Sequence, residues 1–233
     1  MVMQALLIIP FELAWIPFML SVAKRDDAKQ IYSSVLTYFL LIGVFIALAL
    51  SVLSREVIAI MATPPFHDAY KVVPLIAFSY LLFGCYLILQ AGIYIEGKTK
   101  YVPLIVGAGA VLNLGLNYLL IPSYGMMGAA TATLLSYLLL PVAMLFVAGK
   151  YYPIRYEFDR IIKIVLAAVP IYVGCMFVST GSLLIEGLIK LIILATYPAL
   201  LYVLRLPKPQ ELEKIKQLFH QAPRYIAVKL GRG

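Results

Sequence analysis

The chain has 233 residues, of which 63% are hydrophobic, and its mean hydropathy is +0.96. Soluble domains contain roughly 45–50% apolar residues, so this composition excludes an ordinary soluble domain and predicts an all-α integral membrane protein. The net charge is +8, but the basic residues lie in loops and in the C-terminal tail rather than on one soluble face, which argues against a nucleic-acid partner.

Apolar runs long enough to cross a membrane recur along the chain. A helix of about 20 residues, rising about 1.5 Å per residue, spans the roughly 30 Å hydrocarbon core of a bilayer. The fourth and fifth runs carry no charge and meet at the turn 121–125, so we expect them to form a tight membrane hairpin. About seven transmembrane helices are expected, at residues 1–22, 32–54, 72–95, 101–120, 125–148, 161–178 and 183–204.

Prolines and one short segment interrupt this pattern. Pro10 and Pro17 each remove a backbone hydrogen bond from the first run, which predicts a broken helix. Residues 57–62 are apolar but too short to cross the membrane, and a pair of prolines ends them. Cys85 and Cys175 lie deep within apolar runs, where packing is the simplest role and no disulfide framework is implied.

The basic residues predict how the chain is oriented in the membrane, because lysine and arginine are retained on the cytoplasmic side. Together with the tail, the loops after spans one, three and five contain 16 of the 19 basic residues, whereas the opposite loops contain only Arg55 and Lys71. We therefore expect a multi-pass protein of the cell membrane with an outside N-terminus and a cytoplasmic C-terminus. An outside N-terminus without a leader favours the back half of a longer protein, so this chain is expected to be a C-terminal portion.

Three regions follow from this organisation. Residues 1–150 contain five spans, residues 151–205 contain two additional C-terminal spans, and residues 206–233 form a basic cytoplasmic tail. Within the tail, Leu212 and Phe219 share a helical face with other apolar residues, which is typical of an interfacial helix on an anionic leaflet. A solvated tail explains the same residues, and both interpretations stay open.

Two asparagines in the fourth span are candidates for a polar cavity. Asn113 and Asn117 are four residues apart, so both amides project from one helix face, and in lipid that face needs a partner. The amides would offer donors and acceptors to a sugar or a lipid head group. The alternative is that they bond neighbouring helices, typically contributing about 1 kcal/mol per hydrogen bond in a membrane.

A single carboxylate lies deep in the first span. Glu12 is 12 positions before Lys24, which places it about 18 Å from that boundary. A charge at a helix centre costs about 2.5 to 3.5 kcal/mol on insertion scales, so Glu12 is either a coupling group that binds protons or cations, or a carboxyl that ties two helices together. Gln90 in the third span is a weaker candidate for the same cavity.

The last span contains two opposite charges in helical register. Glu186 and Lys190 are four residues apart in the order that favours an ion pair within one helix. Lys190 lies about 10 Å inside Leu183, so its side chain can extend toward the interface. An intramembrane ion pair with a structural role is the favoured interpretation.

Sequence features that would indicate an enzyme are lacking. The chain has no glycine-rich phosphate loop, no His/Cys cluster with metal-ligand spacing and no paired aspartates typical of membrane prenyl- or glycosyltransferases. We therefore expect no catalytic residues, no metal and no cofactor.

The hairpin resembles a known family. Its residues match the pattern "N..lN..LIP.yG..GAA.AT" of polysaccharide flippases in the MATE-like exporter superfamily, and shorter similarities run in order along residues 5–150. The matching hairpin residues are Asn113, Asn117, Leu120, Ile121, Pro122, Tyr124, Gly125, Gly128, Ala129, Ala130, Ala132 and Thr133.

The resemblance implies a fold and an activity. Members of this family resemble MATE transporters, with two six-helix lobes around a central cavity and often two added C-terminal helices. This chain would then be the C-terminal lobe with the two extra helices, and its partner would be an N-terminal lobe or a second polypeptide. The implied activity is translocation of a polyprenyl-diphosphate-linked oligosaccharide by alternating access.

Two other functions compete with this one. A cation-coupled exporter of small amphipathic molecules would belong to the same superfamily, with Glu12 as the coupling site. A membrane glycosyltransferase or polymerase subunit is disfavoured, because the acidic motif and a large external loop are missing. The flippase hypothesis places Glu12, Gln90, Asn113 and Asn117 in the cavity wall.

Overall fold

The computed structural model describes residues 2–207, and every regular element within that range is a helix. The chain begins with a π-helical turn, η1 (Gln4–Ile8), followed directly by α1 (Ile9–Val22). Pro10 lies where η1 joins α1, and Pro17 is accommodated inside α1. The helix is therefore not broken as expected, and its one irregularity is the wider π-helical turn that precedes Pro10.

Two long helices form the centre of the molecule. α2 (Ala28–Val52) packs against α4 (Val73–Leu89), and the short α3 (Ser54–Met61) and the 3-10 helix η2 (Pro64–Val72) connect them. As expected, α3 is too short to cross a membrane. The chain bends after Leu89 and continues as α5 (Ala91–Ile95). Trp15 of α1 is buried and donates a hydrogen bond to the carbonyl of Leu87 in α4 (3.0 Å).

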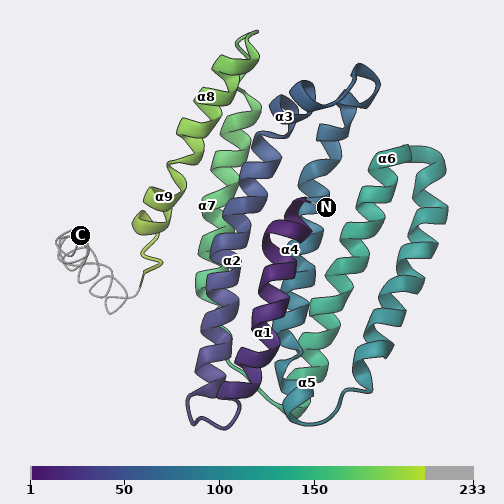
Figure 1. The fold of residues 1–233 in the computed structure, drawn as a ribbon, viewed down its shortest axis with the longest axis vertical. Coiled ribbons are helices and arrows are strands. Elements are labelled where there is room, and N and C mark those ends of the chain that lie inside the picture. The colour runs from purple at the N-terminus through teal and green to yellow at the C-terminus, as the bar shows by residue number, and fades with distance from the viewer. Residues whose placement is uncertain (1, 208–233) are drawn as a thin grey trace, which may run out of the picture.

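The predicted hairpin is present as α6 (Tyr101–Tyr151), which folds back on itself at Gly125 (Figure 1). Gly125 has φ = 52° and ψ = −127°, a conformation that L side chains rarely adopt. A Cβ atom on Gly128 would clash with the backbone of Leu120, so the absence of a side chain allows the two arms to meet closely. The hairpin therefore depends on two glycines with separate roles.

The last helices lie on the other side of α2 from α4 and α6. α7 (Phe158–Met176) packs against α2, while α8 (Leu183–Leu194) and α9 (Tyr197–Val203) pack against α7 (Figure 1). Five helical segments of residues 2–207 are long and apolar enough to span a membrane. One of these segments is α6, which has two arms because it folds back at Gly125. With α7 added, these helices are consistent with the expected seven crossings in an all-α membrane fold.

The two ends of the helix bundle differ in charge. At one end, the loops after α1 and α5 meet the C-terminal end of α6, where Lys29, Lys98 and Lys100 lie over tyrosine rings. The other end contains α3, η2, the fold-back of α6 and the start of α8 (Figure 1). Arg55 and Lys71 lie in the segment between α2 and α4 at this second end. The tail residues 208–233, including the candidate interfacial helix, lie outside the described residues.

Candidate functional site

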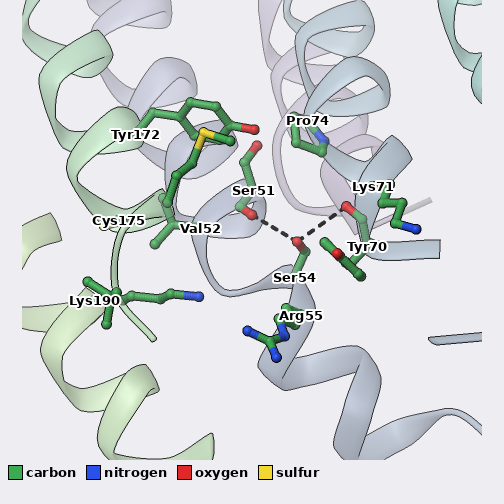
Figure 2. A pocket seen from close by; sticks show the side chains of 12 residues that line it. Ser51, Val52, Ser54, Arg55, Tyr70, Lys71, Pro74, Tyr172, Cys175 and Lys190 are labelled. Atoms are coloured by element: carbon green, nitrogen blue, oxygen red, sulfur yellow. Dashed lines mark hydrogen bonds between the residues drawn. The ribbon is translucent and has the colours of Figure 1, made fainter. Parts of the chain in front are cut away.

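A cavity of about 400 Å³ lies at the end of the bundle that contains α3. This volume is within the range of small-molecule binding sites. Its walls come from α2, α3, η2, α4, α7 and α8, so segments far apart in the sequence contribute to one space (Figure 2). The lining residues are Ser51, Val52, Ser54, Arg55, Tyr70, Lys71, Pro74, Tyr172, Cys175, Met176, Val178 and Lys190.

Two serines shape the wall where α2 ends and α3 begins. The hydroxyl of Ser51 donates to the carbonyl of Ala47 within α2 (2.6 Å). The hydroxyl of Ser54 donates to the carbonyl of Ser51 (2.8 Å) and lies 3.4 Å from the carbonyl of Tyr70 (Figure 2). Because Ser54 contacts both α2 and η2, it fixes the position at which α3 turns away from the bundle and directs Arg55 and Glu56.

The deepest charge of the cavity is the ammonium group of Lys190. Lys190 is 6% exposed, and its Nζ atom donates to Oε1 of Glu56 at 2.5 Å. Glu56 is equally buried, and its second oxygen, Oε2, has no hydrogen-bond partner. Two charges removed from water require each other for compensation, so this pair joins α3 to α8 across 134 residues of sequence.

A second ion pair lies beside the first. Nη1 of Arg55 is 3.3 Å from Oε2 of Glu186, and the Arg55 side chain remains half exposed. The other oxygen of Glu186 accepts hydrogen bonds from the backbone N–H groups of Thr180 (2.9 Å) and Gly181 (3.1 Å). Glu186, in the first turn of α8, therefore fixes the connection from α7 in addition to compensating Arg55.

The third cation of the cavity is at its rim. Lys71 pairs with Asp68 at 2.8 Å, and both side chains are largely in solvent. Exposed pairs of this kind contribute little to stability. The cavity thus has two accessible cations, Arg55 and Lys71, and one deep cation, Lys190, each beside a carboxylate.

A second cavity, of about 420 Å³, adjoins the first. Ser51, Pro74 and Tyr172 line both. Apart from Ser51 and Tyr172, the walls of the second cavity are apolar and come from α2, α4, α6 and α7; its other residues are Val44, Leu48, Leu75, Phe78, Leu82, Leu134, Val165, Ala168 and Val169. The site is therefore amphipathic, with a polar, cationic end and an apolar end.

Glu12 and Gln90 come together elsewhere. Both line a small cavity of about 60 Å³ between α1 and the end of α4, beside Trp15. Glu12 lies on the exposed face of α1, whereas Gln90 is buried. The proposed grouping of these two residues stays a prediction, and this location is separate from the amphipathic site.

The two asparagines lie on the first arm of α6. Nδ2 of Asn117 donates to Oδ1 of Asn113 at 2.9 Å, while Oδ1 of Asn117 is buried without a hydrogen-bond partner. Both residues are partly exposed. They line neither the amphipathic site nor the cavity beside Glu12. Their role as cavity residues or as bonds between helices stays open.

The expected ion pair within α8 is arranged differently in the structure. Glu186 and Lys190 each pair with a residue of α3, namely Arg55 and Glu56. The physical reason is that α3 presents two adjacent opposite charges, Arg55 and Glu56, to α8. Each of them lies within ion-pair distance of its partner on α8. Both residues are buried, so Lys190 does not extend to the interface.

Sequence reasoning did not identify Arg55 and Glu56 as site residues. Their signal is visible in retrospect, because Arg55-Glu56 interrupts an otherwise apolar stretch between two runs and precedes a segment too short to span the membrane. Nothing in that pattern indicates which helix would supply the partners.

Comparison with known proteins gives one result. The sequence model of the MatE family matches residues 20–119, from the end of α1 into the first arm of α6. This match supports membership of the MATE superfamily, whose members are transporters. Neither the curated proteins nor the solved structures contain a match to this chain. The match includes Arg55, Glu56 and Lys71 but not α7 or α8, which complete the amphipathic site.

Proposed function

We propose that this chain is the C-terminal part of a flippase that moves a polyprenyl-diphosphate-linked saccharide across the cell membrane by alternating access. The observation that carries the proposal is that the cationic and apolar cavities lie next to each other and share three lining residues, Ser51, Pro74 and Tyr172. A lipid-linked diphosphate has the matching chemistry, because its anionic head seeks cations and hydrogen-bond donors while its isoprenoid chain seeks an apolar wall.

The charge distribution supports an orientation for this activity. The end of the bundle with the clustered lysines would face the cytoplasm, and the amphipathic site would lie at the outer end. The C-terminus would then be cytoplasmic. At the outer end, the cavity would receive the head group late in translocation, before release into the outer leaflet. The saccharide itself would occupy the larger passage between this lobe and its partner lobe.

Transport of a fluorescent lipid-linked oligosaccharide by the complete protein in proteoliposomes tests the proposal. Protection of the fluorophore from an impermeant quencher measures its translocation. The double variant Arg55→Gln/Lys71→Gln removes the two accessible cations without breaking the buried pair, and we expect transport to fall at least several-fold. Lys29→Gln, at the opposite end, is the matched control. Equal transport by the wild type and the double variant would contradict the proposed site.

A second function, export of small amphipathic molecules coupled to a cation, is favoured by a different observation. Glu12 lies exposed on α1, beside Gln90, at a helix depth where an uncompensated carboxylate is costly. For this function, Glu12→Gln would abolish the dependence of export on the proton or sodium gradient. Unchanged transport by this variant across pH and sodium concentration would remove Glu12 from the mechanism.

A further inference from the structure

In the amphipathic site, a bound anion and the Glu56 carboxylate would compete for Lys190, the most deeply buried cation. Lys190 lines the cavity, yet its ammonium group already donates to Glu56. An anion that enters the cavity to its full depth must therefore compete with the Glu56 carboxylate. Of the three cations, Lys190 is the most shielded from water, so its attraction for an anion is the least screened.

Losing Lys190 would leave Glu56 without a compensating charge. Its Oε2 atom has no hydrogen-bond partner even in the intact pair. The nearby cations are engaged elsewhere, because Arg55 pairs with Glu186 and Lys71 pairs with Asp68. A buried carboxylate deprived of its partner is strongly unfavourable, and the simplest way to remove the charge is to bind a proton.

We propose that the cavity binds an anionic head group and a proton together. The anion takes the hydrogen bonds of the Lys190 ammonium, and the Glu56 carboxylate takes a proton from solvent, so the buried charge is unchanged. Loss of the proton reverses the exchange, because the ionised Glu56 reclaims Lys190 and displaces the anion. The pair thus acts as a release switch, and this inference rests on the proposed function only for the identity of the anion.

The other charged groups around the site explain why Glu56 is the proton acceptor. Glu186 keeps Arg55 and two backbone N–H donors when Lys190 moves, and Asp68 is in solvent beside Lys71. Neither depends on Lys190 for its compensation. Besides Glu56, the titratable and charged groups that line the cavity or pair with its lining residues are Arg55 on α3, Asp68, Tyr70 and Lys71 on η2, Tyr172 and Cys175 on α7, and Glu186 and Lys190 on α8.

The sign of the pH dependence follows from linkage. If the complex holds one more proton than the free protein, acid favours binding and the affinity for a permanently charged anion rises as pH falls. A sulfate monoester is a suitable probe because it stays ionised throughout, so any pH dependence belongs to the protein. Decyl sulfate below its micelle concentration supplies both an anionic head and an apolar chain.

Calorimetric titration of decyl sulfate into the complete protein in nanodiscs tests the inference. Repeating the titration in buffers of different ionisation enthalpy gives the number of protons taken up, and nanodiscs without protein give the partition background. We expect uptake approaching about one proton per bound anion in the wild type. Binding without proton uptake, or no binding above background, would overturn the proposal.

Variants identify the group that takes the proton. Glu56→Gln removes the competing charge, so we expect proton uptake to vanish and affinity at neutral pH to rise several-fold. Asp68→Asn is the matched control, a carboxylate-to-amide change at the cavity rim that should leave proton uptake intact. If Glu56→Gln does not fold, Glu56→Gln/Lys190→Met restores a neutral interior. This double variant should bind decyl sulfate more weakly than the wild type and without proton uptake, because only the cations Arg55 and Lys71 remain in the cavity.

The outcomes separate this inference from the proposed function. Proton-linked binding of decyl sulfate without transport of any lipid-linked saccharide would contradict the flippase and leave the switch standing. Saccharide transport that is equally fast in the wild type and in Glu56→Gln, with no proton uptake on binding, would contradict the switch alone.

Discussion

Lys190 and Glu56 form a buried ion pair although 134 residues separate them in the sequence. One belongs to α8 and the other to α3, so the pair holds the last helices against the connection between α2 and α4. Both side chains are less than a tenth exposed. Such a pair is costly to form but more costly to break, because each charge is left in a poorly solvated site when its partner is removed.

Breaking this pair should destabilise the protein. We expect Lys190→Met to lower the free energy of unfolding by about 3–5 kcal/mol, because Glu56 is left buried and uncompensated. The double variant Glu56→Gln/Lys190→Met should recover most of that loss. Unfolding in mild detergent, followed by circular dichroism, measures both. A double variant as unstable as the single one would show that packing, not charge, dominates the contact.

An alanine substitution in α6 should destabilise the protein at Gly128 but not at Gly115. Gly128→Ala places a Cβ against the backbone of Leu120, and we expect a loss of about 1–3 kcal/mol from the resulting overpacking. Gly115 has open space around its Cβ position, so Gly115→Ala is the matched control and should be neutral or stabilising. Equal thermal stabilities of the two variants would contradict the close approach of the two arms.

The asparagine pair can be assigned by a double-mutant cycle. If the hydrogen bond from Asn117 to Asn113 is structural, replacing each by leucine, singly and together, should reveal a coupling of about 0.6 kcal/mol, the average for such bonds in membranes. Transport should then survive all three variants. Loss of transport with unchanged stability would instead place the amides in the substrate pathway.

The single tryptophan reports directly on the packing of α1 against α4. Because Trp15 is buried and donates to the Leu87 carbonyl, we expect blue-shifted emission and weak quenching by acrylamide. Trp15→Phe should cost about 0.5–1.5 kcal/mol beyond any change in packing, since the Leu87 acceptor loses its donor. Emission typical of a water-exposed indole would contradict the buried position.

The proposed orientation predicts which loops are accessible from outside the cell. Ser179 lies in the exposed connection between α7 and α8, and Thr99 lies in the exposed loop after α5. A membrane-impermeant maleimide should label Ser179→Cys in intact cells and Thr99→Cys only after permeabilisation. The native Cys85 is buried and should remain unlabelled in the folded protein, whereas Cys175 lines the cavity and is replaced by alanine in both variants. The reverse pattern would invert the topology.

The sequence by itself determined the helical membrane fold, the hairpin at Gly125 and the short segment after α2. These features depend on the length of apolar runs, on the missing side chain of glycine and on the fixed φ of proline, all of which are local properties of the chain. The break expected from Pro10 and Pro17 did not follow from these local properties, because the helix continues through both prolines with only a π-helical turn before Pro10.

Only the tertiary structure decided which charges meet. Glu186 and Lys190 have a favourable spacing within α8, but the facing helix α3 offers each of them a nearer opposite charge. Likewise, no local pattern indicates that Ser51, Pro74 and Tyr172 line both a cationic cavity and an apolar one. Compensation of a buried charge and the walls of a cavity depend on neighbours in space, and those neighbours are set by how the helices pack.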